Sequence, residues 1–161
     1  MIRLSVGQGI DQYISQLQNL EFTATDSIGK AIYYGADIVA DAIKANLEGL
    51  PTDEGYADDG QKLGGIKAIQ KTGLIKGFGI AKQSNDRGYI NVKVGFHGYN
   101  ALKTKKFPNG QPNSMVARTV ESGNSFTQKH PFVRPAVNAT KDRAERKMAE
   151  IIDEEIKKVM K

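Results

Sequence analysis

Hydrophobic side chains recur along this chain with two periods, one of two residues and one of three to four residues. Near the N-terminus Ile2, Leu4 and Val6 alternate with polar residues, which predicts a half-buried strand over residues 2–6. The apolar residues that follow recur at three- and four-residue steps. This change of period predicts an amphipathic helix over about residues 9–21.

A longer helical pattern comes next. Thr23, with Asp26 three positions later, is typical of a capping box, so the helix is expected to begin there. Gly49 and Pro51 predict its end, because both residues interrupt helices. Its apolar stripe consists of Ile28, Ile32, Val39, Ala42, Ile43 and Leu47.

The middle of the chain predicts a hairpin. Residues 63–77 are rich in glycine, and their pattern fits either a short helix or a bent strand. A strand is expected around Phe78 and Ile80, followed by the turn sequence SNDRG. Apolar and polar residues then alternate through YINVKVGF, residues 89–96, which predicts one continuous strand paired with the preceding one.

The last third of the chain predicts two helices. Ser114 can cap a short helix, and Gly123 stands where a left-handed C-terminal cap belongs. A long charged helix is expected from Pro135 onward, because proline suits the first helical turn. Its apolar stripe consists of Val137, Ala144, Met148, Ile152, Ile156 and Val159. Together the elements predict a single α+β domain over residues 1–161, with helices packed on one face of a mostly antiparallel sheet.

Two long loops of opposite charge separate these elements. The acidic loop, residues 48–62, has no basic residue before Lys62, whereas the basic loop, residues 98–113, has no acidic residue. Loops of this length in compact domains are usually functional or disordered. We therefore hypothesise that the acidic loop of one subunit meets the basic loop of the next in a head-to-tail ring. The alternative is two independently solvated loops. The residues considered for this contact are Asp53, Glu54, Asp58, Asp59, Lys103, Lys105, Lys106 and Phe107.

The composition of the chain restricts the classes of function further. The chain contains no cysteine, which excludes disulfides and thiolate chemistry, and no apolar run approaches the roughly 18 residues that span a bilayer. The net charge of +5 is compatible with contact to DNA. The segment from Tyr99 to Phe107 also interleaves lysines with aromatic residues, as single-strand binders do.

No catalytic or metal-binding motif is present. His97 and His130 are distant in sequence and belong to no metal-spaced cluster, and the glycines between Gly73 and Gly79 lack the residues of a phosphate-binding loop. Glu121 is interpreted as a helix-end residue rather than an acid catalyst. We expect a protein that is not an enzyme, with no catalytic residue, cofactor or metal.

Three short segments, in this order, carry a resemblance to a known family. They are Thr72-Gly73-Leu74, then ARTVESG at residues 117–123 after a hairpin, and PFVRPA at residues 131–136. Over about residues 25–160 the chain resembles the tail-completion or tail-terminator family of long-tailed bacteriophages. Asn124 is a departure, because the family commonly has Thr at this position.

The resemblance implies a structural virion protein of the phage neck. Such a protein typically forms a sixfold homo-oligomeric ring that caps the tail tube protein and joins it to the head-completion or connector protein, without catalysis or cofactor. The ring surrounds the DNA path, so passing contact with the genome is implied. The protein would be made in the host cytoplasm and reside in the virion. The alternatives are a DNA-contacting module and an adaptor or stopper elsewhere in the head–tail connector.

The PFVRPA segment itself predicts a structural anchor. Pro131 and Pro135 restrict their neighbours to extended conformations, which would hold Phe132 against the core and direct the last helix. Arg134 would then reach a carboxylate or carbonyl nearby, with Glu121 as a candidate. Together with Gly123, these residues form the predicted anchor. The alternative is that Phe132 is exposed and anchors a subunit contact.

Overall fold

The computed structural model describes residues 21–159, and the protein is α+β with a long C-terminal helix, as the sequence predicts. The strand predicted over 2–6 and nearly all of the helix predicted over 9–21 lie outside the described residues. The elements are, in chain order, α2 (Glu21–Glu48), α3 (Ala68–Gly77), β1 (Phe78–Ile80), β2 (Ser84–Asp86), β3 (Tyr89–Asn91), β4 (Val94–Phe96), α4 (Asn113–Ser122) and α5 (Val133–Val159).

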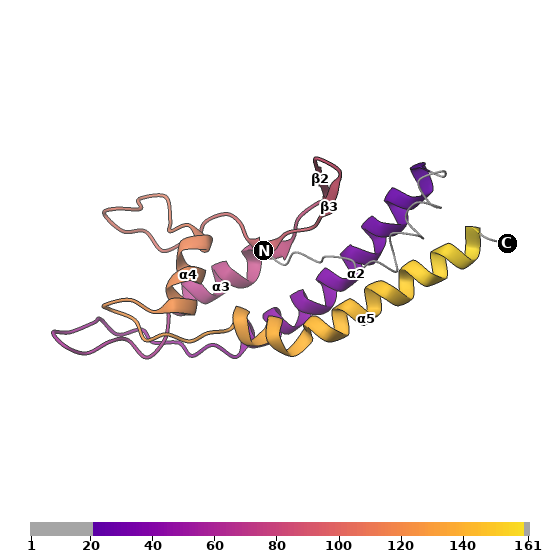
Figure 1. The fold of residues 1–161 in the computed structure, drawn as a ribbon. Coiled ribbons are helices and arrows are strands. Elements are labelled where there is room, and N and C mark those ends of the chain that lie inside the picture. Colours follow the sequence, from indigo (N-terminus) through magenta and orange to yellow (C-terminus); the bar gives the residue numbers. More distant parts are fainter. Residues whose placement is uncertain (1–20, 160–161) are drawn as a thin grey trace.

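The two long helices, α2 and α5, run side by side in opposite directions and form one arm of an elongated molecule (Figure 1). At the outer end of the arm, Lys30 Nζ lies 2.8 Å from Glu155 Oε1. At the inner end, Asn46 Nδ2 donates to the carbonyl oxygen of Phe132 at 3.0 Å. The shorter helices and the long loops gather at the other end of the molecule (Figure 1).

The helices of the arm pack through a stripe of buried residues that recur about every four positions. On α2 these are Ser27, Ala31, Gly35, Val39, Ile43 and Leu47, and on α5 they are Ala136, Thr140, Ala144, Met148 and Ile151. Many of them are small, so the helices approach closely: a Cβ at Gly35 would lie 2.7 Å from Met148 Sδ. The predicted α5 stripe is therefore only partly correct. Ala144 and Met148 are buried, but Val159, at the end of α5, is exposed.

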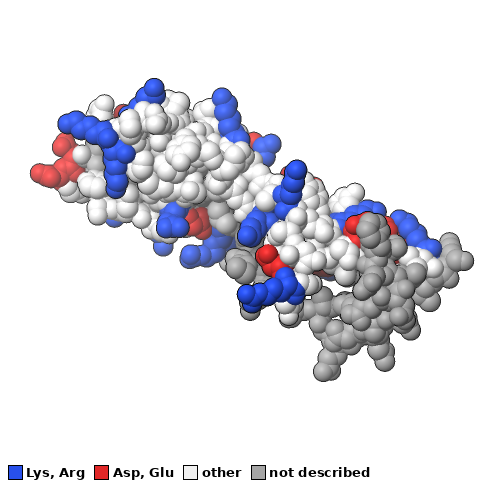
Figure 2. All heavy atoms as spheres, turned by 90° about the horizontal axis from the view of Figure 1, so that it is seen from above, with Lys and Arg blue, Asp and Glu red and all other residues white. Residues whose placement is uncertain are grey.

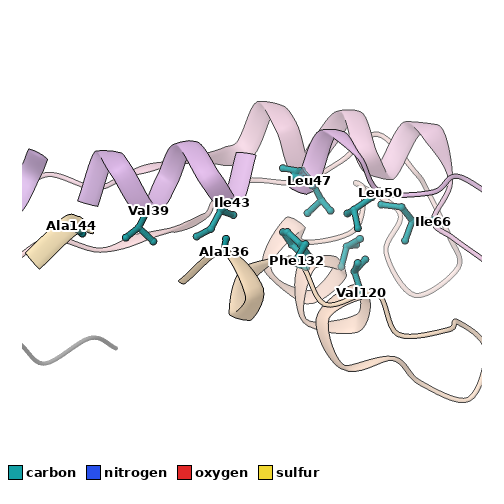
Figure 3. Close-up of a cluster of buried hydrophobic side chains, with 12 residues drawn as sticks. Val39, Ile43, Leu47, Leu50, Ile66, Val120, Phe132, Ala136 and Ala144 are labelled. Atoms are coloured by element: carbon teal, nitrogen blue, oxygen red, sulfur yellow. The ribbon is translucent and has the colours of Figure 1, made fainter. Parts of the chain in front are cut away.

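The main core lies where the arm meets the shorter helices (Figure 3). Leu47 from α2, Leu74 from α3 and Phe132 at the start of α5 are its largest fully buried side chains. The Phe132 ring packs edge-on against Phe96 of β4, with ring centroids 5.8 Å apart. Segments from all four described helices thus converge on one cluster.

The predicted hairpin forms, but its strands are divided. β1 pairs with β4 and β2 pairs with β3, both antiparallel. Between the two ladders, residues 81–83 lie opposite residues 92–93, so the first strand carries one extra residue. This is a β-bulge, which interrupts the ladder locally. The prediction of one continuous strand over residues 89–96 is therefore wrong. The turn at Arg87 and Gly88 is as predicted, and both residues have positive φ, as a type I′ turn requires.

Two predicted helix starts are also wrong. Thr23 lies inside α2, which is already helical at Glu21, so it does not cap the helix. α4 begins at Asn113 with Pro112 before it, so Ser114 is inside that helix as well. Gly123 does cap the end of α4 with a positive φ of 71°, and its N–H donates to the Thr119 carbonyl oxygen at 2.7 Å, but its ψ of 172° lies outside the left-handed helical region that was predicted.

Candidate functional site

The acidic loop is ordered by its own carboxylates. Asp53 accepts hydrogen bonds from the backbone N–H groups of Gly55 and Gly64, each at 2.9 Å. These bonds, helped by the charge of Lys67, hold the pKa of Asp53 below its usual value. Glu54 Oε1 accepts the N–H of Ala68, the first residue of α3, at 2.7 Å. Asp53 and Glu54 are therefore occupied within the chain.

The outer part of the acidic loop presents a different set of groups. Asp58 and Asp59 are exposed beside a tight turn, in which the N–H of Gln61 donates to the Asp58 carbonyl oxygen at 3.0 Å. Tyr56 is 90% exposed, and the ammonium group of Lys67 lies 4.9 Å from the centre of its ring. Lys67 also donates to the carbonyl oxygens of Glu54 and Gly55. The loop therefore holds an exposed aromatic ring next to two exposed carboxylates.

The basic loop is also ordered. Its two ends pair at Tyr99 and Pro112, and the N–H of Asn100 donates to the Gln111 carbonyl oxygen at 2.9 Å. At its outer turn, Thr104 and Phe107 exchange backbone hydrogen bonds at 3.0 and 3.1 Å. Phe107 is half-buried, with Lys106 Nζ 5.7 Å from its ring centre. The three exposed cations of this loop are Lys103, Lys105 and Lys106.

The two charged loops extend toward the same end of the molecule, on opposite sides of α3 and α4 (Figure 1). The view onto the basic-loop side shows Lys and Arg side chains spread along the whole face rather than gathered in one patch (Figure 2). The fold thus brings together the predicted contact residues of each loop but keeps the two sets apart. Opposite charges on opposite sides of one subunit can meet only between two copies.

A third loop, residues 123–132, is joined to the acidic loop. The N–H of Leu63 donates to the Phe126 carbonyl oxygen at 2.8 Å, and the N–H of Gln128 donates to Leu63 at 2.9 Å. Asn124, the departure from the family pattern, accepts the N–H groups of Phe126 and Thr127 through its side-chain oxygen. The amide therefore supplies an acceptor that closes the turn. Phe126 projects from this loop and is 65% exposed.

Glu121, at the end of α4, binds the start of α5. Its carboxylate accepts the backbone N–H groups of Phe132, Val133 and Arg134 at 2.8, 2.9 and 3.0 Å. The next residue, Pro135, has no N–H, so all the N–H groups that the first helical turn leaves unpaired are accounted for. Burial would raise the pKa of Glu121, but these three bonds and the charge of Arg134 lower it below its usual value.

This geometry refines two predictions about the PFVRPA segment. Glu121 is the partner expected for Arg134, but the hydrogen bond comes from the Arg134 backbone N–H, while the side-chain charge acts on the carboxylate. Val133 and Arg134 are helical and not extended, because the carboxylate stabilises the helical turn on which α5 begins two residues before Pro135. Phe132 is 1% exposed, so its ring belongs to the core and not to a surface.

A pocket of about 310 Å³ lies on the basic-loop side of α3. It is lined by residues of α3, including Thr72 and Lys76, and by the segment from His97 to Ala101. Asn100 and Asn113 also line it and are 3% and 2% exposed. The Nδ2 of Asn100 and the Oδ1 of Asn113 have no hydrogen-bond partner. Two residues of the pocket lining therefore hold one unused donor and one unused acceptor, both covered by protein.

The two histidines of the chain belong to different parts of the structure. His97 is exposed beside the pocket, and His130 Nε2 lies 2.7 Å from the Gly64 carbonyl oxygen. Within residues 21–159 no group of three or more His, Asp or Glu side chains could hold a metal ion. No helix in this part of the chain is long and apolar enough to cross a bilayer.

Comparison with known proteins gave no match, whether to protein-family models, to curated proteins or to solved structures.

Several features of this end of the molecule carry no clear signal in the sequence. The exposure of Tyr56 and Phe126 and the burial of Asn100 and Asn113 depend on contacts between segments far apart in the chain. An aromatic residue between glycine and alanine, or an asparagine in a polar loop, does not reveal its burial by any periodicity. The sequence features that point to this end of the molecule are the length and the opposite charges of the two loops and the lysine–aromatic segment of the basic loop.

Proposed function

We propose that this chain is a structural subunit of the neck of a long-tailed bacteriophage, which terminates the tail tube and joins it to the head connector as part of a ring. The proposal rests on the three segments that resemble the tail-completion family. In the fold these segments converge: Leu74, Val120 and Phe132 lie in one core cluster, and Glu121 binds the start of the PFVRPA helix. The residues that carry the resemblance are thus the residues that hold the domain together.

The charged loops support the ring-forming part of the proposal. A head-to-tail contact needs two different, complementary surfaces on each subunit, and it closes into a ring when the rotation permits. The acidic loop, with the exposed Asp58 and Asp59, extends on one side of α3 and α4, and the basic loop, with its three exposed lysines, extends on the other (Figure 1). Complementary charge of this kind sets register and orientation between subunits.

The proposed function is tested by cryo-electron microscopy of the intact particle. The expected result is density for this chain as a ring between the tail tube and the head connector, with α2 and α5 recognisable as a long helical pair. A particle whose neck lacks this chain would contradict the proposal. An adaptor or stopper role would instead place the chain in a neighbouring ring of the connector.

A DNA-contacting module is the second candidate function, favoured by the three exposed lysines at one ordered turn. If each lysine neutralises one phosphate, the logarithm of the binding constant should fall with the logarithm of salt concentration with a slope of about −3. Fluorescence anisotropy with duplex DNA at several salt concentrations measures this slope. Binding that is absent at low salt would eliminate this candidate without affecting the ring proposal.

A further inference from the structure

We infer that Tyr56 of one copy of this chain inserts into the pocket between α3 and the basic loop of the next copy. The inference rests on the proposed head-to-tail ring and names its contact: an aromatic side chain on one surface and its receiving pocket on the other. The acidic loop, which carries Tyr56, and the basic loop, which forms one wall of the pocket, extend on opposite sides of α3 and α4 (Figure 1), so the contact forms between copies.

Tyr56 has the properties of an interface anchor. Its ring is 90% exposed, although the loop that carries it is fixed by Asp53 and by Lys67, whose ammonium lies over the ring. A large exposed ring on an ordered loop loses little conformational freedom on binding. Tyrosine is among the residues that most often dominate binding energy at protein interfaces.

The pocket suits a side chain better than a free ligand. Its volume of about 310 Å³ is at the lower limit of small-molecule sites, which run from about 300 to 1,000 Å³. Ile69 contributes apolar surface to the α3 side of the pocket, and Thr72 and Lys76 line the same side. A single aromatic ring fits this description.

Charge favours a second copy of this chain as the occupant. Tyr56 is followed after one residue by Asp58 and Asp59, and both carboxylates are exposed. The pocket is bordered by Lys76, and the loop that forms one of its walls continues to the three exposed lysines. An incoming Tyr56 would therefore bring two carboxylates toward a surface that carries only basic charge.

The polar groups of the pocket select tyrosine over phenylalanine. A phenol hydroxyl is both donor and acceptor, and the pocket holds an unpaired acceptor on Asn113 and an unpaired donor on Asn100. Both atoms are covered in the free chain, and the other atom of each amide is already bonded: Asn100 Oδ1 accepts the N–H of Leu102, and Asn113 Nδ2 donates to the His97 carbonyl oxygen. The hydroxyl would reach the unused donor and acceptor after a small shift of the pocket lining that keeps these two bonds. Phe126 is also exposed, but it lacks the hydroxyl that would use this pair.

The absence of cysteine in the chain makes the contact directly testable by disulfide trapping. One variant carries Ala57→Cys beside Tyr56, and a second carries Ala101→Cys in the pocket wall. The two are mixed under mild oxidation, and the yield of disulfide-linked dimer is measured. Ala57→Cys mixed with Asp153→Cys, on the outer half of α5, is the matched control. We expect a link in the first mixture and none in the control.

Variants at Tyr56 test whether its side chain stabilises the contact or only lies near it. Adding Tyr56→Ala to the Ala57→Cys chain should lower the trapping yield about 30-fold, the loss expected for an interface hot spot. Tyr56→Phe should lower the yield about 5- to 10-fold, because Asn100 Nδ2 and Asn113 Oδ1 then stay unpaired. Since Tyr56 is exposed, neither change should affect folding. Unchanged trapping with Tyr56→Ala would overturn the inference.

A second pair of cysteine variants distinguishes a failure of this inference from a failure of the proposed function. Asp59→Cys and Lys105→Cys report the meeting of the two charged loops without involving the pocket. A link at 59 and 105 together with no link at 57 and 101 would leave the head-to-tail ring in place and overturn the insertion of Tyr56. No link in either mixture at high protein concentration would overturn both.

Discussion

At the scale of single residues, two side chains hold the start of α5 in place, one through the core and one through the backbone. Phe132 fills the core beneath the start of α5, and the carboxylate of Glu121 binds the backbone of the same turn from the end of α4. The side chain is apolar and buried, whereas the backbone is polar and needs a partner. The two residues therefore satisfy the opposite requirements of one short segment.

Replacing Phe132 with alanine should lower the free energy of unfolding by about 3 to 5 kcal/mol, because a fully buried ring is lost and a cavity remains. Urea denaturation measures this difference. Phe126→Ala is the matched control: it removes the same side chain from an exposed position and should change stability by about 0.5 kcal/mol or less. Equal effects of the two substitutions would contradict the burial of Phe132.

Glu121→Gln should destabilise the protein by about 1 to 2 kcal/mol at pH 7, as losing a helix cap does. The pKa of Glu121 is lowered in the folded state, so its contribution is present above the ordinary value of 4.5 and is lost as pH falls through the folded-state pKa. The stability gap between the parent and this variant should therefore narrow below about pH 4.5. Urea titrations between pH 7 and pH 3 measure it.

The control for this pH dependence is Glu145→Gln, which makes the same chemical change at an exposed position of α5. Glu155, whose hydrogen bonds from Lys158 and Lys30 lower its pKa to about 2, titrates in the parent and in both variants and cancels in the comparison. If the stability difference between the parent and Glu121→Gln stays constant with pH, the charge of Glu121 does not stabilise the start of α5.

At the scale of the elements, small residues allow helices to lie close to their neighbours. In the arm, small residues let α2 and α5 pack along a four-residue stripe, and at the other end Gly73 lets α3 lie against the base of the basic loop. A Cβ at Gly73 would lie 2.4 Å from the Cβ of Asn100 and 2.9 Å from its Cα. The glycine of the Thr-Gly-Leu segment is therefore required by packing and not by the helix itself.

Gly73→Ala should destabilise the protein, although alanine is the better helix former by about 1 kcal/mol. The added methyl group collides with the Asn100 backbone, and overpacking of this kind costs about 1 to 3 kcal/mol. Lys76→Ala, on the same helix but exposed, should change stability by about 0.5 kcal/mol or less. A more stable Gly73→Ala variant in thermal unfolding would show that α3 can move away from the basic loop.

At the scale of the whole molecule, the elongated shape separates two regions. The helical arm holds its own ion pairs, such as Lys30 with Glu155, and the loop end carries the exposed aromatic rings and the charged turns. Ordered loops at one end are expensive in conformational entropy unless contacts stabilise them. In this chain, internal hydrogen bonds hold both charged loops in place before any partner binds.

Reversing Lys103, Lys105 and Lys106 to Glu should abolish self-association, because like charges would then meet at the head-to-tail contact. Sedimentation velocity at low and high salt measures the effect, and the parent should dissociate more readily as salt screens the contact. The control reverses Lys141, Arg143 and Lys157, which are exposed on α5. Assembly and salt dependence that are untouched by the loop reversal would contradict the electrostatic contact.

The sequence by itself determined the elements whose signals are local. The 3.6-residue period predicted α5, Gly49 and Pro51 predicted the end of α2, and the turn at Arg87 and Gly88 followed from its residues. These features depend on neighbours within a few positions, so the order of residues is enough to predict them. The α+β class and the two long loops followed from the same patterns.

The tertiary structure alone decided the features that depend on distant partners. It divided the strand over residues 89–96 by a bulge, moved the start of α5 to Val133, and assigned Glu121 to backbone N–H groups rather than to the Arg134 side chain. It also exposed Tyr56 and formed the pocket at Asn100. Each of these depends on which segments meet in space, and loop closure and packing settle that only when the whole chain has folded.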